Sequence, residues 1–205
     1  MPASPRVRAI CVGQAESLPA RDAGGRTVPV VSGIAKRAVS TLDRPEPIEI
    51  GPMGVAGDTV VDLSVHGGRD QAVYLYPVEH YAFWQTVRAQ AGHPGPLEPG
   101  QLGENLLVEG LLEPSVWIGD RLHLGEVELR VESPRSPCFK FNARMGFDWA
   151  SSMMNQSGYT GFYCSVVRQG RLAAGAAIDV FPGDRVVTIE QRHRLRHGHR
   201  PGGRN

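Results

Sequence analysis

The segment Ser133–Asn142 carries the densest set of reactive residue types in this 205-residue chain. It contains Cys138, which lies three residues after Arg135 and two before Lys140, just past an expected strand. Cations beside a thiol favour its thiolate form, which attacks electrophiles and binds soft metals. Lys140 is also one of only two lysines in an arginine-rich chain, which indicates a role for a compact ammonium group. The pattern therefore favours a functional cysteine over a structural cysteine in a proline-rich turn.

The other two cysteines, Cys11 and Cys164, lie in apolar runs without adjacent cations. We expect both to be buried in strands and unreactive. Three widely spaced cysteines with no CxxC pair argue against a disulfide framework and against a zinc knuckle.

Two further segments place polar side chains beside glycines. In Val65–Asp70, the paired glycines Gly67 and Gly68 would let backbone amides approach an anion, and His66 and Arg69 add donors. Taken alone, this pattern is more often an ordinary turn.

The segment Leu102–Leu106 places Glu104 and Asn105 directly after Gly103, where they could cap a turn or hold a polar ligand. A hydrolase triad of Cys138, His66 and Asn105 is conceivable from residue types alone. The chain contains no P-loop, no GxGxxG after a strand, no HExxH and no GxSxG elbow.

The elements that must position these residues are expected to be short strands. The chain has 25 glycines and 16 prolines, well above the usual share of about 12%. So many turn-forming residues favour a mainly β fold, a barrel or sandwich with one or two peripheral helices. Expected strands cover residues 6–12, 34–39, 48–50, 159–167 and 186–189, with a hairpin over 121–131. Expected helices lie between Pro77 and Gly92 and over residues 147–156.

The charge of the chain is unevenly distributed. Residues 190–205 contain five arginines and one acid, whereas the whole chain has a net charge of only +1. The sequence thus predicts a domain over residues 1–189 and a basic, disordered tail over 190–205. The tail lacks aromatic residues for base stacking, so we expect no nucleic-acid partner. With no long apolar run and no signal-peptide core, we also expect no membrane partner and a cytoplasmic location.

Taken together and in order, these segments resemble the MOSC domain, the molybdenum-cofactor sulfurase C-terminal domain, with the YiiM-like branch as the closest likeness. The resemblance covers most of residues 6–187. The matching pieces are Gly54-Val-Ala-Gly-Asp58, His66-Gly-Gly68, Tyr76-Pro-Val-Glu-His-Tyr81, Gly103-Glu-Asn105, Pro134-Arg-Ser-Pro-Cys-Phe-Lys140 and Gly161-Phe-Tyr163.

The resemblance implies a β-barrel-rich fold that binds a pterin-type molybdenum cofactor. Cys138 would be the protein thiolate on the metal, and Cys138, His66 and Asn105 would form the catalytic set. The remaining residues implied to contact the cofactor are Gly67, Gly68, Arg69, Gly103, Glu104, Arg135, Lys140 and Asn142.

The activity implied by the resemblance is reduction of N-hydroxylated compounds, such as N-hydroxylated purine bases. The chain has neither a flavin fingerprint nor a cysteine cluster, so an external flavin or iron–sulfur reductase would supply electrons. One alternative is a non-catalytic sulfur carrier or cofactor-binding module with a Cys138 persulfide. Pyridoxal-phosphate chemistry is a weaker alternative, because no partner for the ring nitrogen accompanies Lys140.

Overall fold

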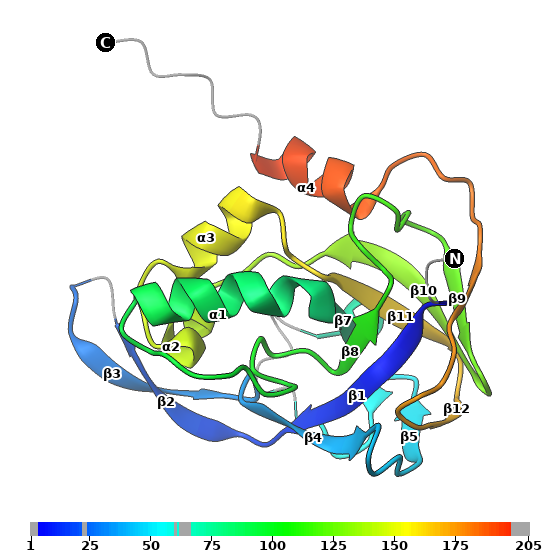
Figure 1. Ribbon diagram of the computed structural model, residues 1–205, viewed down its shortest axis with the longest axis horizontal. Coiled ribbons are helices and arrows are strands. Elements are labelled where there is room, and N and C mark those ends of the chain that lie inside the picture. Colours follow the sequence, from blue (N-terminus) through cyan, green and yellow to red (C-terminus); the bar gives the residue numbers. More distant parts are fainter. Residues whose placement is uncertain (1–3, 22–23, 60, 62–66, 198–205) are drawn as a thin grey trace.

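The computed structural model describes residues 4–21, 24–59, 61 and 67–197, and its main element is an eight-stranded mixed sheet (Figure 1). The strand order is β13-β9-β10-β11-β7-β8-β1-β4. The bounds of these strands are Asp179–Phe181 (β13), Arg121–Leu124 (β9), Val127–Pro134 (β10), Phe162–Arg168 (β11), Val73–Pro77 (β7), Leu106–Glu109 (β8), Arg6–Gly13 (β1) and Lys36–Thr41 (β4).

Two smaller sheets accompany the main one. The first contains β12 (Gly170–Leu172), β5 (Ile48–Gly51) and β6 (Gly54–Val55). The second is a hairpin of β2 (Glu16–Arg21) and β3 (Thr27–Ser32). Every neighbouring pair in the three sheets is antiparallel except β7–β8. The predicted hairpin over 121–131 is confirmed, since β9 and β10 pair across a turn at Gly125-Glu126.

Strand β7 is buried on both faces and separates two apolar cores. Val73 and Leu75 pack into the core between the sheets, whereas Tyr74 and Tyr76 point into a second core beneath the helices. Alternation of side chains along a strand produces this division. The second core also contains Trp84 and Phe141 from the helical layer.

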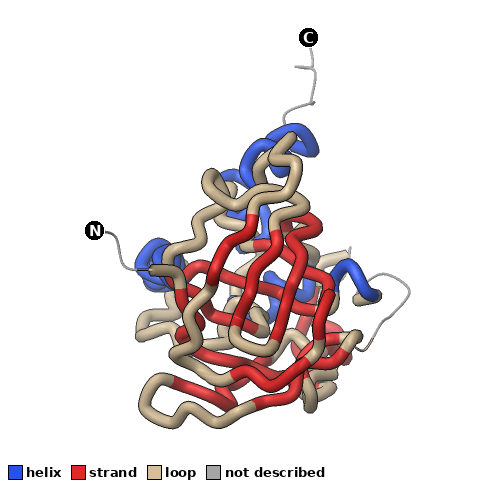
Figure 2. Tube along the Cα trace, turned by 90° about the vertical axis from the view of Figure 1, so that its right-hand side faces the viewer, coloured by secondary structure: helices blue, strands red, loops and turns tan. Residues whose placement is uncertain are grey.

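Three helices lie together on one side of the sheet, as the labels in Figure 1 show. They are α1 (Tyr81–Gln90), α2 (Phe139–Met145) and α3 (Ala150–Ser157). Short 3-10 turns, η1 (Arg69–Gln71) and η2 (Val78–His80), flank β7. A fourth helix, α4 (Ile189–His197), packs against β10. Figure 2 shows the strands gathered in the middle of the molecule with helices around them.

The mainly β class predicted from the sequence is confirmed. The described part of the chain has four α-helices rather than one or two. The hydrogen-bonded order of its main sheet runs from β13 to β4 and does not show a closed barrel. None of the helices in these residues is long and apolar enough to cross a membrane.

The C-terminal segment differs most from expectation. Residues 186–189 do not form a named strand; Thr188 makes a single bridge to Trp117, and a helix starts at Ile189. Residues 190–197, expected to be disordered, are helical because Ile189 and His193 are buried and anchor α4. Residues 198–205 lie outside the described residues, and the division into a domain and a tail stays a prediction.

Candidate active site

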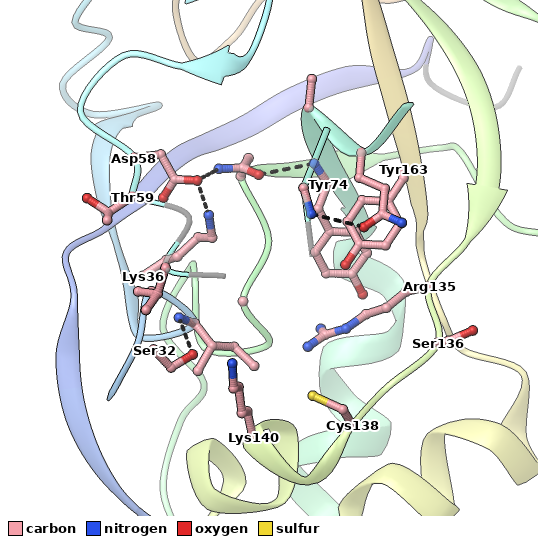
Figure 3. Close-up of a pocket in the computed structure, with 18 residues that line it drawn as sticks. Ser32, Lys36, Asp58, Thr59, Tyr74, Arg135, Ser136, Cys138, Lys140 and Tyr163 are labelled. Atoms are coloured by element: carbon pink, nitrogen blue, oxygen red, sulfur yellow. Dashed lines mark hydrogen bonds and ion pairs between the residues drawn. The ribbon is translucent and has the colours of Figure 1, made fainter. Parts of the chain in front are cut away.

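A cavity of about 120 Å³ lies where β4, β7, β11 and the segments before β8 and after β10 approach one another (Figure 3). Four of the residues predicted to share a site, Asn105, Arg135, Cys138 and Lys140, line this cavity. His66, the fifth, lies outside the described residues. The other lining residues are Ser32, Gly33, Ile34, Lys36, Asp58, Thr59, Val61, Gly67, Gln71, Ala72, Tyr74, Gly103, Ser136 and Tyr163.

One wall of the cavity is the turn that joins β10 to α2. Cys138 immediately precedes α2 and is half-buried, and Lys140 follows in the first turn of that helix. Figure 3 shows the sulfur of Cys138 and the amine of Lys140 both directed into the cavity. A thiol and an ammonium group thus face the same space.

Arg135 supplies a second cation to this wall and is held rigidly. Its guanidinium carbon lies 4.9 Å from the ring centre of Tyr74 and 4.8 Å from that of Phe141, and Nη1 donates to the carbonyl of Leu102. Cation–π contacts with both rings stabilise the buried charge. Burial works against that charge, but Tyr74, Tyr163 and Cys138 more than offset this effect and raise the pKa of Arg135.

The other wall carries a buried ion pair. Lys36, at the start of β4, donates from Nζ to Oδ2 of Asp58, and the two side chains are only 9% and 8% exposed. Oδ1 of Asp58 also accepts from the backbone N–H of Gly13 at 2.8 Å. Lys36 and Asp58 largely cancel each other's charge, so Arg135 and Lys140 give the cavity its net positive character.

Asn105 joins this ion pair to β7. Its Nδ2 donates to Oδ2 of Asp58 at 2.8 Å and to the carbonyl of Cys11 at 3.4 Å. Its Oδ1 accepts from the backbone N–H of Tyr74 at 3.1 Å. Because both ends of the amide are engaged by the protein, Asn105 holds Asp58 and β7 in position in this structure, and its predicted catalytic role stays a prediction.

Two glycines allow the cavity walls to approach closely. A Cβ added to Gly33 would lie 2.0 Å from the carbonyl oxygen of Thr59. Gly103 has φ +86°, and an added Cβ would lie 2.8 Å from Cγ1 of Ile34. A larger residue at either position would displace the segment that carries Lys36.

Several predicted cofactor contacts lie elsewhere. Gly67 lines the cavity and its N–H donates to Gln71 at 3.3 Å, but Gly68 and Arg69 are not among the lining residues. Glu104 is fully buried and accepts from Tyr81 and from two backbone amides, and burial raises its pKa.

Asn142, another predicted cofactor contact, is bonded to backbone groups and does not line the cavity. Its Nδ2 donates to the carbonyl of Asp148 at 2.6 Å, and its Oδ1 accepts from the N–H of Ser151 at 2.7 Å. These bonds tie α2 to the start of α3. Glu104 and Asn142 therefore support the walls of the site and do not face into the cavity.

The two remaining cysteines behave as predicted. Cys11 and Cys164 lie in strands β1 and β11 with no measurable exposure. Burial raises the pKa of both thiols well above the ordinary cysteine value, which keeps them protonated. Cys138 is the one described cysteine that lines the cavity.

Sequence reasoning missed the wall opposite Cys138. Lys36 is the second of the two lysines in the chain, so the rarity that drew attention to Lys140 applies to it equally. Asp58 ends the Gly-Val-Ala-Gly-Asp turn, which alone is a weak signal. Tyr74 was not singled out from the sequence, and the pairing of β7 with β11 brings it beside Tyr163 at the cavity.

Comparison with known proteins shows the family of the chain. The sequence model of the MOSC domain matches residues 62–179, more than half of the chain. The chain belongs to the MOSC domain family. The chain resembles YflK of Bacillus subtilis (strain 168), with 39% identity over 140 residues, and YiiM of Escherichia coli (strain K12), with 32% identity over 139 residues.

Each of these two matches covers 68% of this chain but only 61% of the relative. The chain thus spans about three fifths of the length of both proteins. A protein of Gibberella moniliformis (strain M3125 / FGSC 7600) named "Reductase" is 32% identical over 155 residues, which are 73% of this chain and 27% of that protein.

The fold of this MOSC domain also matches a solved structure. The crystal structure of YiiM from Geobacillus stearothermophilus superposes with a TM-score of 0.71 and 26% identity, and covers 94% of this chain and 84% of that one. Residues 32–36 and 58–59, which build the cavity wall opposite Cys138, precede the family match at residue 62.

Proposed function

We propose that this MOSC domain binds a pterin-type molybdenum cofactor through Cys138 and reduces N-hydroxylated compounds with electrons from an external donor. The observation that carries the proposal is the convergence of a thiol and two cations on one cavity in a chain of this family. The relative named "Reductase" supports the same class of reaction.

The donor set of the cavity fits such a cofactor. Within the described residues, no group of three or more His, Cys, Asp or Glu side chains could hold a bare metal ion. Cys138 offers one soft ligand, so a metal here needs its remaining ligands from an organic group. Arg135 and Lys140 supply the positive charge that an anionic dithiolene and phosphate require.

Each residue then has a defined part. Cys138 would hold the metal, and Lys140 and Arg135 would neutralise the anionic cofactor. Tyr74 and Phe141 keep Arg135 in place, so the charge needs no rearrangement on binding. When bound, the cofactor would supply two-electron redox chemistry, which no amino-acid side chain provides.

The external donor is part of this proposal. The sequence has three cysteines in total, two of them buried in strands, too few to ligate an iron–sulfur cluster of its own. A separate flavin or iron–sulfur reductase would therefore deliver electrons. The substrate would be a small N-hydroxylated molecule, for which the cavity offers a polar wall at Lys36 and Asp58.

Reduction of an N-hydroxylated purine base tests the proposal. Protein purified from cells that make the cofactor would be assayed with reduced viologen, which replaces the unknown donor. We expect turnover that is lost in Cys138→Ser and kept in Cys164→Ala, since Cys164 lies in the core and does not line the cavity.

Two results would count against the reductase proposal. A molybdenum-loaded parent that turns over no N-hydroxylated compound would contradict it. Protein that carries sulfane sulfur on Cys138 and no molybdenum would favour the sulfur-carrier alternative.

A further inference from the structure

The buried amine of Lys36 has no part in the proposed cofactor contacts. It lies on the cavity wall opposite Cys138, as Figure 3 shows, and its side chain is 9% exposed. Burying an ammonium group costs free energy unless the charge is paired. A buried lysine at this position therefore needs a compensating partner, and its presence calls for a functional explanation.

Asp58 is that partner, and it is itself tightly held. Its carboxylate accepts from Lys36, from the N–H of Gly13 and from the amide of Asn105. Hydrogen bonds from three donors stabilise a carboxylate in its charged form. Asp58 is therefore held in place by three donors, and its ion pair with Lys36 keeps the amine at the cavity surface.

The other groups in the cavity are poorer proton sources. Arg135 holds its protons too firmly to release one. The Tyr74 hydroxyl already donates to the carbonyl of Thr160 at 2.6 Å, and burial raises the pKa of both Tyr74 and Tyr163. Lys140 stands beside Cys138 on the wall that would face the anionic cofactor. Among the described residues that line the cavity, Lys36 is the remaining cation, and it is paired with the carboxylate of Asp58.

We propose that Lys36, held by Asp58, is the catalytic acid of this cavity and protonates the departing oxygen of an N-hydroxylated substrate. The inference rests on the proposed function. In the step, the N–O bond breaks as two electrons from the external reductant reach the nitrogen. The hydroxyl oxygen takes the Lys36 proton and leaves as water, and a solvent proton completes the amine. Solvent then reprotonates Lys36 through the cavity.

The groups around Lys36 determine how the proposed activity depends on pH. Burial is the largest influence and lowers the pKa of Lys36 from its ordinary value near 10.5, whereas Asp58, Cys11 and Glu104 raise it. Arg144 also lies close, with Nη2 3.5 Å from the Lys36 carbonyl. The acid must carry its proton, so activity is present below the pKa of Lys36 and declines as pH rises through it.

The substitution Lys36→Arg separates charge from proton transfer. Arginine can keep the ion pair with Asp58 but does not release its proton. We expect kcat to fall about 100-fold, within the range usual for loss of a general acid, with little change in KM. The alkaline decline in kcat should disappear. Molybdenum per chain, measured alongside, should equal that of the parent.

Lys36→Met is the second variant, because it removes both charge and proton while keeping a chain of similar length. We expect the same loss of kcat as in Lys36→Arg. Thermal unfolding of each variant shows whether it folds. If Lys36→Arg does not fold, Lys36→Met still tests the expected loss of kcat, and its molybdenum per chain shows whether the cofactor site is kept.

A readout independent of turnover uses the two-lysine composition of the chain. Lysine labelled with ¹⁵N at the side chain gives two amine signals, and Lys140→Arg assigns them. We expect the Lys36 signal to titrate below the ordinary lysine range, as burial requires.

The outcomes separate the two proposals. An active parent with Lys36→Arg equally active, or with an unchanged pH profile, overturns the role of Lys36 and leaves the proposed function standing. A molybdenum-loaded parent without activity overturns the proposed function and this inference together.

Discussion

Asp58 organises one side of the cavity through three hydrogen bonds from three different parts of the chain. Lys36 comes from β4, Gly13 from the end of β1, and Asn105 from the segment before β8. These residues are far apart in sequence, so a single carboxylate ties the N-terminal strands to Asn105, which lies inside the region that matches the family model. The same carboxylate balances the charge of Lys36.

Replacing Asp58 with asparagine should therefore destabilise the fold. The Lys36 charge would lose its counter-ion in a buried place, and breaking such a pair costs about 3–5 kcal/mol. We expect a lower urea midpoint for Asp58→Asn with an unchanged m-value. As a control, Glu16→Gln removes a partner of exposed Arg37, and its unfolding free energy should change by less than about 0.5 kcal/mol. Equal stability of Asp58→Asn and the parent would show that the pair contributes nothing.

Among the candidate site residues, the sequence predicted those whose neighbours in the chain form a recognisable motif. The Arg135-Ser-Pro-Cys-Phe-Lys140 run carries its charges next to the thiol, so a functional cysteine could be predicted from spacing, whereas its role as a metal ligand comes from the resemblance and stays a prediction. The Lys36–Asp58 pair has no such signature, because its two members are 22 residues apart and meet only through the fold. Glu104 and Asn142 carried the right residue types, but their side chains are turned toward backbone amides.

Helix α4 is ordered although the composition of its segment predicts disorder. Its residues are strongly basic and polar, which predicted disorder, yet His193 is 3% exposed and contacts the carbonyl of Asn155 at 2.8 Å. Arg196 reaches Ser136, two residues before Cys138, at 3.1 Å. The helix therefore packs on the layer that forms one wall of the cavity.

His193→Ala should lower the stability of the domain by weakening the packing of α4. We expect a loss of about 1–3 kcal/mol in unfolding free energy, because the carbonyl of Asn155 loses its partner and the ring contact of His193 with His197 disappears. Arg192→Ala, on the exposed face of the same helix, should stay within about 0.5 kcal/mol of the parent. Identical urea midpoints for the two variants would mean that α4 does not stabilise the domain, as its composition alone suggested.

The architecture of the whole molecule rests on β7, whose two faces serve two cores. Directly beside it, Gly161 precedes β11 with φ +59°, and an added Cβ would lie 2.4 Å from the carbonyl oxygen of Leu75. The close approach of these two strands brings Tyr74 and Tyr163 to the cavity. The mainly β class was predictable from glycine, proline and alternation, but the parallel pairing of β7 with β8 was not, since it depends on contacts between distant segments.

A pair of glycine substitutions distinguishes the stability lost through the close approach of β7 and β11 from the stability lost through backbone strain. Gly161 and Gly125 have similar φ values, +59° and +63°, but an added Cβ at Gly125 would meet no atom within 4 Å. Gly125→Ala should lose about 1–2 kcal/mol from the left-handed backbone alone. Gly161→Ala should lose at least about 2 kcal/mol more, because the strands must separate. Similar urea midpoints for the two variants would show that β7 and β11 are not held this closely.

The molybdenum content of Cys138→Ser tests the central claim most directly. Serine is nearly the same size as cysteine, but its hydroxyl stays protonated near neutral pH and is a poor ligand for this metal. In protein purified from cells that make the cofactor, we predict close to one molybdenum per chain in the parent and in Cys164→Ala. We predict a large loss in Cys138→Ser with unchanged thermal stability of the metal-free fold. Molybdenum bound equally well by Cys138→Ser would contradict the assignment of Cys138 as the metal ligand.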